Sequence, residues 1–120
     1  LVLGGAIDGV PAGFMTLQAV SRRSMTAEIG VAAFRPFFRQ AAALCRGALL
    51  WACDNLELSS FLGKVAAPNR HVLAMLGQVG FRELGRVPGL FWYTRKQRFV
   101  DGVLVMATPE SIRKISAEEA

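Results

Sequence analysis

The stretch of residues 34–42 carries the residue types that could bind an anion. Arg35 and Arg39 lie on either side of Pro36, and a run of alanines follows them. The hydrophobic pattern predicts a strand before this stretch and a helix after it. The first amides of a helix have no intrahelical partner and the helix dipole is positive there, which favours a bound phosphate. Two interpretations follow: a diphosphate site, or two arginines that only cover a surface turn.

Few other side chains have a spacing that points to chemistry. Glu28 lies in an apolar stretch, 27–31, and is either a general base or a strand-face carboxylate paired with an arginine. His71, the single histidine, has no Cys or acidic cluster beside it, and the cysteines lack zinc spacing. Cys45 and Cys53 would lie about 12 Å apart on one helix, too far for a disulfide. We therefore expect free thiols and no metal.

Hydrophobic periodicity predicts the elements that would position these residues. Strands are expected at 1–7, 14–20, 25–32, 58–66, 81–87 and 97–106, and helices at 39–54 and 69–80. Asp8-Gly9 predicts a hairpin turn, and the polar segment 21–24 predicts the next turn. Gly30, inside a strand, predicts a bulge or a close backbone approach. The order is β-β-β-α-β-α-β-β, and mixed pairing is expected because hairpin links and a strand-helix-strand crossover both occur.

The helices and the remaining segments carry further expectations. The helix at 39–54 is apolar nearly all round, which predicts that it is largely buried. Asn69 is the candidate N-cap of the second helix and Gly80 its C-terminal glycine. Residues 88–96 are predicted to form a loop. Residues 108–120 are predicted to form a polar tail that frays or adds a short helix.

Composition limits the class of protein and its partners. The 120 residues suit one domain, and a 52% hydrophobic content argues against disorder. The net charge of +5 favours polyanions without choosing among nucleic acid, a membrane surface and a phosphate-rich cofactor. Aromatic residues 91–93 precede the basic Arg95, Lys96 and Arg98, so a weak nucleic-acid interpretation stays open beside that of a solvated loop. The most apolar stretch, 41–53, contains Arg46 and is too short to span a bilayer, so we expect no membrane partner. Free thiols are typical of a reducing compartment, so we expect a cytoplasmic location.

Several motifs of the C-terminal half follow one another in a set order. These are Asn69, an amphipathic helix, Gly80-Phe81, the glycine-containing strand 83–87, an aromatic loop and the closing strand Asp101-Gly102-Val103-Leu104-Val105-Met106. With the earlier strand at 27–31, this order resembles the GNAT superfamily of N-acetyltransferases, especially the branch that acetylates ribosomal-protein N-termini.

The resemblance implies an α/β (α+β) fold with a mixed, mostly antiparallel central sheet flanked by helices. Residues 1–107 would form an acyl-CoA-binding domain, and residues 108–120 a tail. The family's first strand and two helices would precede Leu1, because the chain starts inside an apolar run without an initiator Met.

The resemblance also implies a reaction, in which an acetyl group moves from acetyl-CoA to a primary amine by direct attack. The strands at 28–32 and 58–66 would part, and the pantetheine arm of the cofactor would lie between them. A backbone N–H near the split would polarise the thioester carbonyl. Glu28 would act as general base through water. Tyr93 could substitute for the family's tyrosine in protonating the leaving thiolate, or it could be a plain surface aromatic. The implied cofactor-binding residues are Ile29, Gly30, Val31, Arg39, Gln40, Ala41, Ala42, Ala43, Leu44 and Asn69, although Asn69 could be a plain helix cap.

Two departures from the family pattern leave a second hypothesis open. Ala42 and Leu44 stand where the family's phosphate loop has glycines, so the loop is degenerate. Leu76 stands seven residues after Asn69, where many members have Tyr. The alternative is a non-catalytic GNAT-like module for binding or assembly, for example a phage virion component. For the enzyme, the expected acceptor is a small-molecule or peptide amine. A homodimer or larger assembly stays open because edge strands can pair between subunits.

Overall fold

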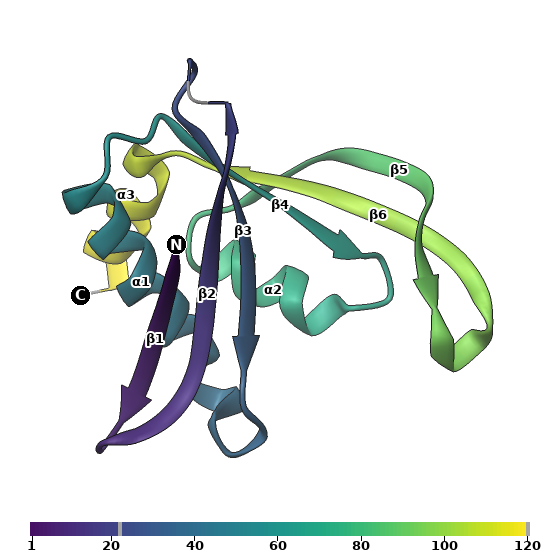
Figure 1. Ribbon diagram of the computed structural model, residues 1–120, viewed down its shortest axis with the longest axis horizontal. Coiled ribbons are helices and arrows are strands. Elements are labelled where there is room, and N and C mark those ends of the chain that lie inside the picture. The colour runs from purple at the N-terminus through teal and green to yellow at the C-terminus, as the bar shows by residue number, and fades with distance from the viewer. Residues whose placement is uncertain (22, 120) are drawn as a thin grey trace.

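A six-stranded sheet with the order β1-β2-β3-β4-β6-β5 organises the computed structural model, which describes residues 1–21 and 23–119 (Figure 1). The strands are β1 (Val2–Ile7), β2 (Val10–Ser21), β3 (Thr26–Ala33), β4 (Ser60–Ala66), β5 (Arg82–Tyr93) and β6 (Arg98–Ala107). The helices are α1 (Ala41–Asn55), α2 (Arg70–Gln78) and α3 (Pro109–Glu119), with 3-10 turns η1 (Arg35–Gln40) and η2 (Thr94–Lys96). The predicted fold class and element order are confirmed. Arg22 of the predicted turn and Ala120 of the predicted tail lie outside the described residues.

The sheet consists of two antiparallel halves that meet at a short parallel contact. β1, β2 and β3 form one half, and β4, β6 and β5 form the other. Among the described residues, only three pairs join them: Thr26–Ser60, Ala27–Phe61 and Glu28–Leu62. Beyond these pairs β3 and β4 diverge, as Figure 1 shows.

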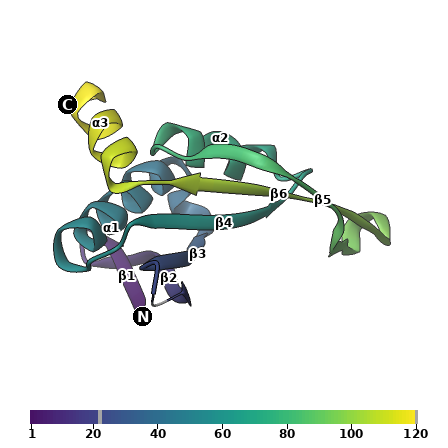
Figure 2. The same cartoon turned by 90° about the horizontal axis from the view of Figure 1, so that it is seen from above.

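One face of the sheet, the inner face, carries the hydrophobic core. Side chains of a strand alternate between faces, so Met15, Ile29, Phe61 and Val105 are buried together with Leu49 of α1. Figure 2 shows α2 and α3 on the same side of β4. The opposite, outer face carries more polar side chains, among them Thr16, Glu28 and Lys64. The residues predicted to do chemistry are therefore divided between two faces of one sheet.

The predicted loop at 88–96 is wrong, because β5 continues through Pro88 to Tyr93. Proline cannot donate a ladder hydrogen bond, but β5 is an edge strand and one of its sides needs no partner. The pairing with β6 is irregular between Val87 and Phe91, and Gly89 there has φ +63°. The irregularity lets the strand pass the proline.

The prediction that the helix at 39–54 is largely buried is also wrong. In α1 only Cys45, Leu49 and Ala52 are buried, and Trp51 is 43% exposed. The helix also starts at Ala41, because the residues around Arg39 form η1 instead.

Gly30 causes no bulge, since β3 pairs regularly with β2 through it. The close neighbour there is a side-chain atom, Thr16 Oγ1, which would lie 2.7 Å from a Cβ at Gly30.

Candidate active site

The split between β3 and β4 exposes two unpaired strand edges. From Ile29 onward β3 has no strand partner on its β4 side within the described part of the chain, and the same holds for β4 from Gly63 onward. Backbone N–H and C=O groups on such an edge can pair with an extended ligand, as an added strand would. The split can thus hold a linear, amide-containing arm.

Glu28 stands at the base of the split, on the outer face. Its Oε1 lies 3.4 Å from Nζ of Lys64, which belongs to β4 on the other side of the split. Both side chains are partly exposed. One interpretation of Glu28 from its sequence context was a strand-face ion pair with an arginine, and the structure shows such a pair with a lysine instead.

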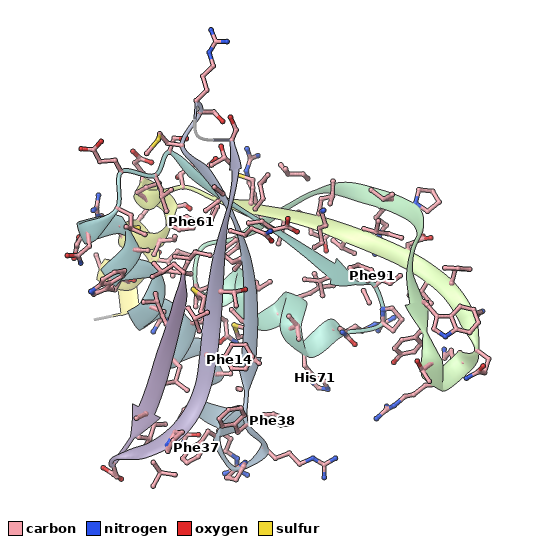
Figure 3. All side chains as sticks on the ribbon, in the orientation of Figure 1. Phe14, Phe37, Phe38, Phe61, His71 and Phe91 are labelled. Carbon is pink, nitrogen blue, oxygen red and sulfur yellow. The ribbon has the colours of Figure 1, made fainter. Side chains whose placement is uncertain are left out.

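A cavity of about 1150 Å³ lies on the inner side of the sheet, between β1–β3, η1, α1 and α2. Its walls include six of the residues predicted to bind the cofactor: Val31, Arg39, Ala41, Ala42, Ala43 and Leu44. His71 and Met75 of α2 form part of the opposite wall. Figure 3 shows Phe38 at the lower end of β3 and His71 on the neighbouring α2. The cavity therefore connects the end of β3 with the start of α1.

The start of α1 is only partly available for phosphate. No acidic residue lies in its first turn, and the side chain of Gln40 makes no capping hydrogen bond. The N–H of Ala41, however, already donates to the carbonyl of Phe38, because η1 runs directly into the helix. An anion bound here would rely on the exposed Arg39 and on donors beyond Ala41.

Leu44 does not add bulk at the start of the helix. Its side chain packs toward β1, where its Cδ2 would lie 3.1 Å from a Cβ at Gly5. Glycine at position 5 leaves room for this leucine. The leucine in the predicted phosphate loop is thus accommodated by the sheet.

Cys45 also lines the cavity, but it is chemically inert there. Burial raises the pKa of its thiol to about 12, an effect that the nearby Arg46 guanidinium only partly offsets. The thiol stays protonated at neutral pH, and the thiolate is the nucleophilic form. Cys45 is therefore not a candidate nucleophile.

Three predicted site residues outside β3, namely Gln40, Asn69 and Tyr93, do not line this cavity. Asn69 occupies the N-cap position of α2, but its side chain makes no capping hydrogen bond.

Tyr93 ends β5, opposite Arg98 at the far end of β6. Eight residues of β6 separate Arg98 from Met106, which pairs with Leu62 beside Glu28. At about 3.3 Å per residue this separation is about 26 Å. Figure 3 shows Phe91 on the same distant hairpin.

Sequence reasoning missed Lys64 and the position of His71. A lysine inside an apolar strand was a visible signal, but its carboxylate partner depends on the β3–β4 register. Nothing in the local sequence indicates that His71 faces the cavity.

Within the described part of the chain, neither a metal centre nor a membrane span is found. Among residues 1–21 and 23–119, no group of three or more His, Cys, Asp or Glu side chains could hold a metal ion. Of the helices in the same ranges, none is long and apolar enough to cross a bilayer.

No protein-family model and no curated protein matches the chain. Solved structures with a similar arrangement include several acetyltransferases. A spermidine N-acetyltransferase variant from Vibrio cholerae superimposes with a TM-score of 0.82 at 16% identity, covering 99% of this chain and 69% of that one. A GNAT-family acetyltransferase from Streptococcus pneumoniae gives 0.79 at 17% identity, covering 89% and 66%.

The spermidine N-acetyltransferase from Vibrio cholerae in complex with CoA and spermine gives a TM-score of 0.74 at 19% identity. That match covers 85% of this chain and 60% of the enzyme, so this chain spans less than two thirds of its length. These comparisons show that the chain has the fold of GNAT acetyltransferases.

Proposed function

We propose that this chain is the acyl-CoA-binding and catalytic part of an N-acyltransferase that moves an acetyl group from acetyl-CoA to a primary amine. The observation that carries the proposal is the split, in which two parallel strands pair over three residues and then part beside a large cavity. The similar enzyme from Vibrio cholerae, in complex with CoA and spermine, supports an amine acceptor. The acceptor would be a small-molecule or peptide amine.

The residues of the split and the cavity suit acetyl-CoA. The unpaired edge at Ile29, Gly30 and Val31 would pair with the amides of the pantetheine arm. Arg39 would hold the diphosphate together with Gln40 and with the first turn of α1, residues 41–44. Asn69 would contact the cofactor from the start of α2. Guanidinium groups bind phosphate oxygens through two parallel hydrogen bonds, which compensates for the missing glycines.

Acetyl-CoA supplies an activated thioester, and the chain would supply orientation and proton transfer. A backbone N–H of the β3 edge would donate to the carbonyl oxygen as negative charge develops on it. The amine would enter from the outer face, where Glu28 would take its proton through water. We do not assign the protonation of the thiolate to Tyr93, since the hairpin holds it about 26 Å away along β6.

Calorimetry with acetyl-CoA tests the proposal directly. We expect binding by the wild-type chain, and about tenfold weaker binding by Arg39→Gln because a charge-assisted hydrogen bond is lost. Lys114→Gln removes the same charge from α3 and serves as the matched control. Release of free CoA with spermidine or a short peptide as acceptor then measures turnover. Absence of binding at millimolar acetyl-CoA would rule the proposal out.

Two observations favour the second candidate, a non-catalytic module with the GNAT fold that serves binding or assembly, for example in a phage particle. The N–H of Ala41 is already used by Phe38, and Glu28 is paired with Lys64. This candidate predicts intact folding without thioester turnover. Turnover with any amine acceptor would exclude it.

A further inference from the structure

A second cavity, of about 620 Å³, lies on the other side of α2. It is lined by Ala67, Pro68, Arg70, Leu73, Glu83, Arg86 and Lys96. None of these residues lines the large cavity, because α2 separates the two: Arg70 and Leu73 face one cavity, and His71 and Val72 face the other. The second cavity is therefore distinct from the candidate active site.

The lining of this cavity carries three cations, Arg70, Arg86 and Lys96, against one carboxylate, Glu83. Within residues 1–21 and 23–119, none of the three cations takes part in an ion pair. Like charges around one hollow repel each other. An anion bound between the cations would attract each of them and so offset that repulsion.

The fold brings these cations together from three segments. Arg70 is the first residue of α2, Arg86 belongs to β5, and Lys96 ends η2 at the hairpin tip. β5 has two irregularities in its pairing, between Glu83 and Gly85 and between Val87 and Phe91, and bulges bend a strand. Figure 1 shows the hairpin curving beyond the first turn of α2. The bend places the tip of the hairpin on the side of Arg70.

We propose that this basic cavity binds a small polyanion that carries two or more phosphate groups. Two of the three cations are arginines, whose planar guanidinium groups match phosphate oxygens. The volume lies in the range of small-molecule sites. The three exposed cations line one hollow, which favours a compact anion over an extended nucleic-acid backbone. The two exposed aromatic residues of the hairpin, Trp92 and Phe99, pack edge to face against each other, with their ring centroids 5.2 Å apart.

Calorimetric titration of the intact chain with sodium tripolyphosphate at low salt tests this proposal without involving acetyl-CoA. We expect Arg86→Gln/Lys96→Gln to raise Kd at least tenfold. Arg23→Gln/Lys114→Gln removes the same charge elsewhere and should change Kd less than twofold. The same loss is expected when the Arg86→Gln/Lys96→Gln double change is made in an Arg39→Gln background, which lacks the diphosphate ligand proposed for the large cavity, so failure here and failure of the proposed transferase are distinguishable. Circular dichroism confirms that each variant is folded.

Several results would overturn the proposal. One is no binding by the wild-type chain at millimolar tripolyphosphate, and another is equal loss in both double variants, which would indicate only general charge attraction. Glu83→Gln removes the one repelling carboxylate and should tighten binding several-fold; unchanged or weaker binding would place the anion elsewhere. Binding of a single-stranded uridine 20-mer without binding of tripolyphosphate would identify the hairpin as a nucleic-acid surface instead.

Discussion

At the scale of single residues, the ion pair of Glu28 and Lys64 lies at the base of the split, on the outer face of the sheet. The carboxylate and the ammonium belong to different strands and are 3.4 Å apart. An exposed ion pair of this kind contributes about 0–1 kcal/mol to stability. If the chain transfers an acetyl group, the role of Glu28 as a base therefore matters more than the contribution of the ion pair to stability.

Glu28→Gln is expected to reduce turnover by about 10²–10⁴-fold, because the amine then lacks a proton acceptor. The affinity for acetyl-CoA, measured by calorimetry, should stay the same, since Glu28 lies on the face away from the cavity. Lys64→Gln breaks the same ion pair but keeps the carboxylate, so it separates the two roles. Equal turnover in Glu28→Gln and wild type would show that Glu28 is not the base.

The Cys45 thiol gives a prediction about pH. Burial raises its pKa from 9.0 to about 12, so the folded state holds this proton more tightly than the unfolded state. The associated stabilisation is present below pH 9 and is lost as the pH rises towards 12. Denaturant titrations should therefore show a steeper alkaline loss of stability in the wild type than in Cys45→Ala. Rapid labelling of Cys45 by a thiol reagent in the folded protein at pH 8 would contradict its burial.

At the scale of elements, Gly80 joins α2 to β5 in a conformation that other residues rarely adopt. Its φ is +114°, and a Cβ there would lie 3.0 Å from the carbonyl oxygen of Ser111 and 3.1 Å from backbone atoms of Ile112. The Ser111 hydroxyl also donates to the Gly80 carbonyl at 2.9 Å. The connection is thus tied to α3, the helix that residues 109–119 of the predicted tail form.

Gly80→Ala should lower the free energy of unfolding by about 1–3 kcal/mol or more through backbone strain and close contact. Gly77, in α2, offers a matched control because a Cβ there meets nothing within 4 Å. Gly77→Ala should stabilise the chain by about 0.5–1 kcal/mol, since alanine favours a helix. Urea denaturation measures both variants, and similar effects of the two changes would refute the argument.

The order of elements could be predicted from sequence because alternation and helical spacing are local properties. Pro88 misled the prediction, since its effect depends on whether the strand is at an edge, which no local pattern reveals. The ion-pair partner of Glu28 and the distance of Tyr93 depend on strand register. The second cavity was unpredictable for the same reason, because three distant segments form it.

At the scale of the whole molecule, one core joins the elements. Leu49 of α1 is completely buried and belongs to the same cluster as Met15 of one half-sheet and Phe61 of the other. Leu49→Ala should cost about 2–5 kcal/mol, because it removes buried methyl groups and leaves a cavity. Trp51→Ala, on the exposed side of the same helix, should cost less. Thermal unfolding followed by two probes tests this, and separate transitions would show that the halves do not share a core.

The short contact between β3 and β4 also has a dynamic consequence. Each half keeps its own ladder of hydrogen bonds, and only three strand pairs of described residues join the two ladders beside the shared core. We therefore expect the unpaired edges, from Ile29 and Gly63 onward, to exchange their amide protons faster than the paired residues of either ladder. A ligand bound between these two strand edges would connect them, and the slowing of amide exchange at Ile29 and Gly63 would measure how strongly it stabilises them.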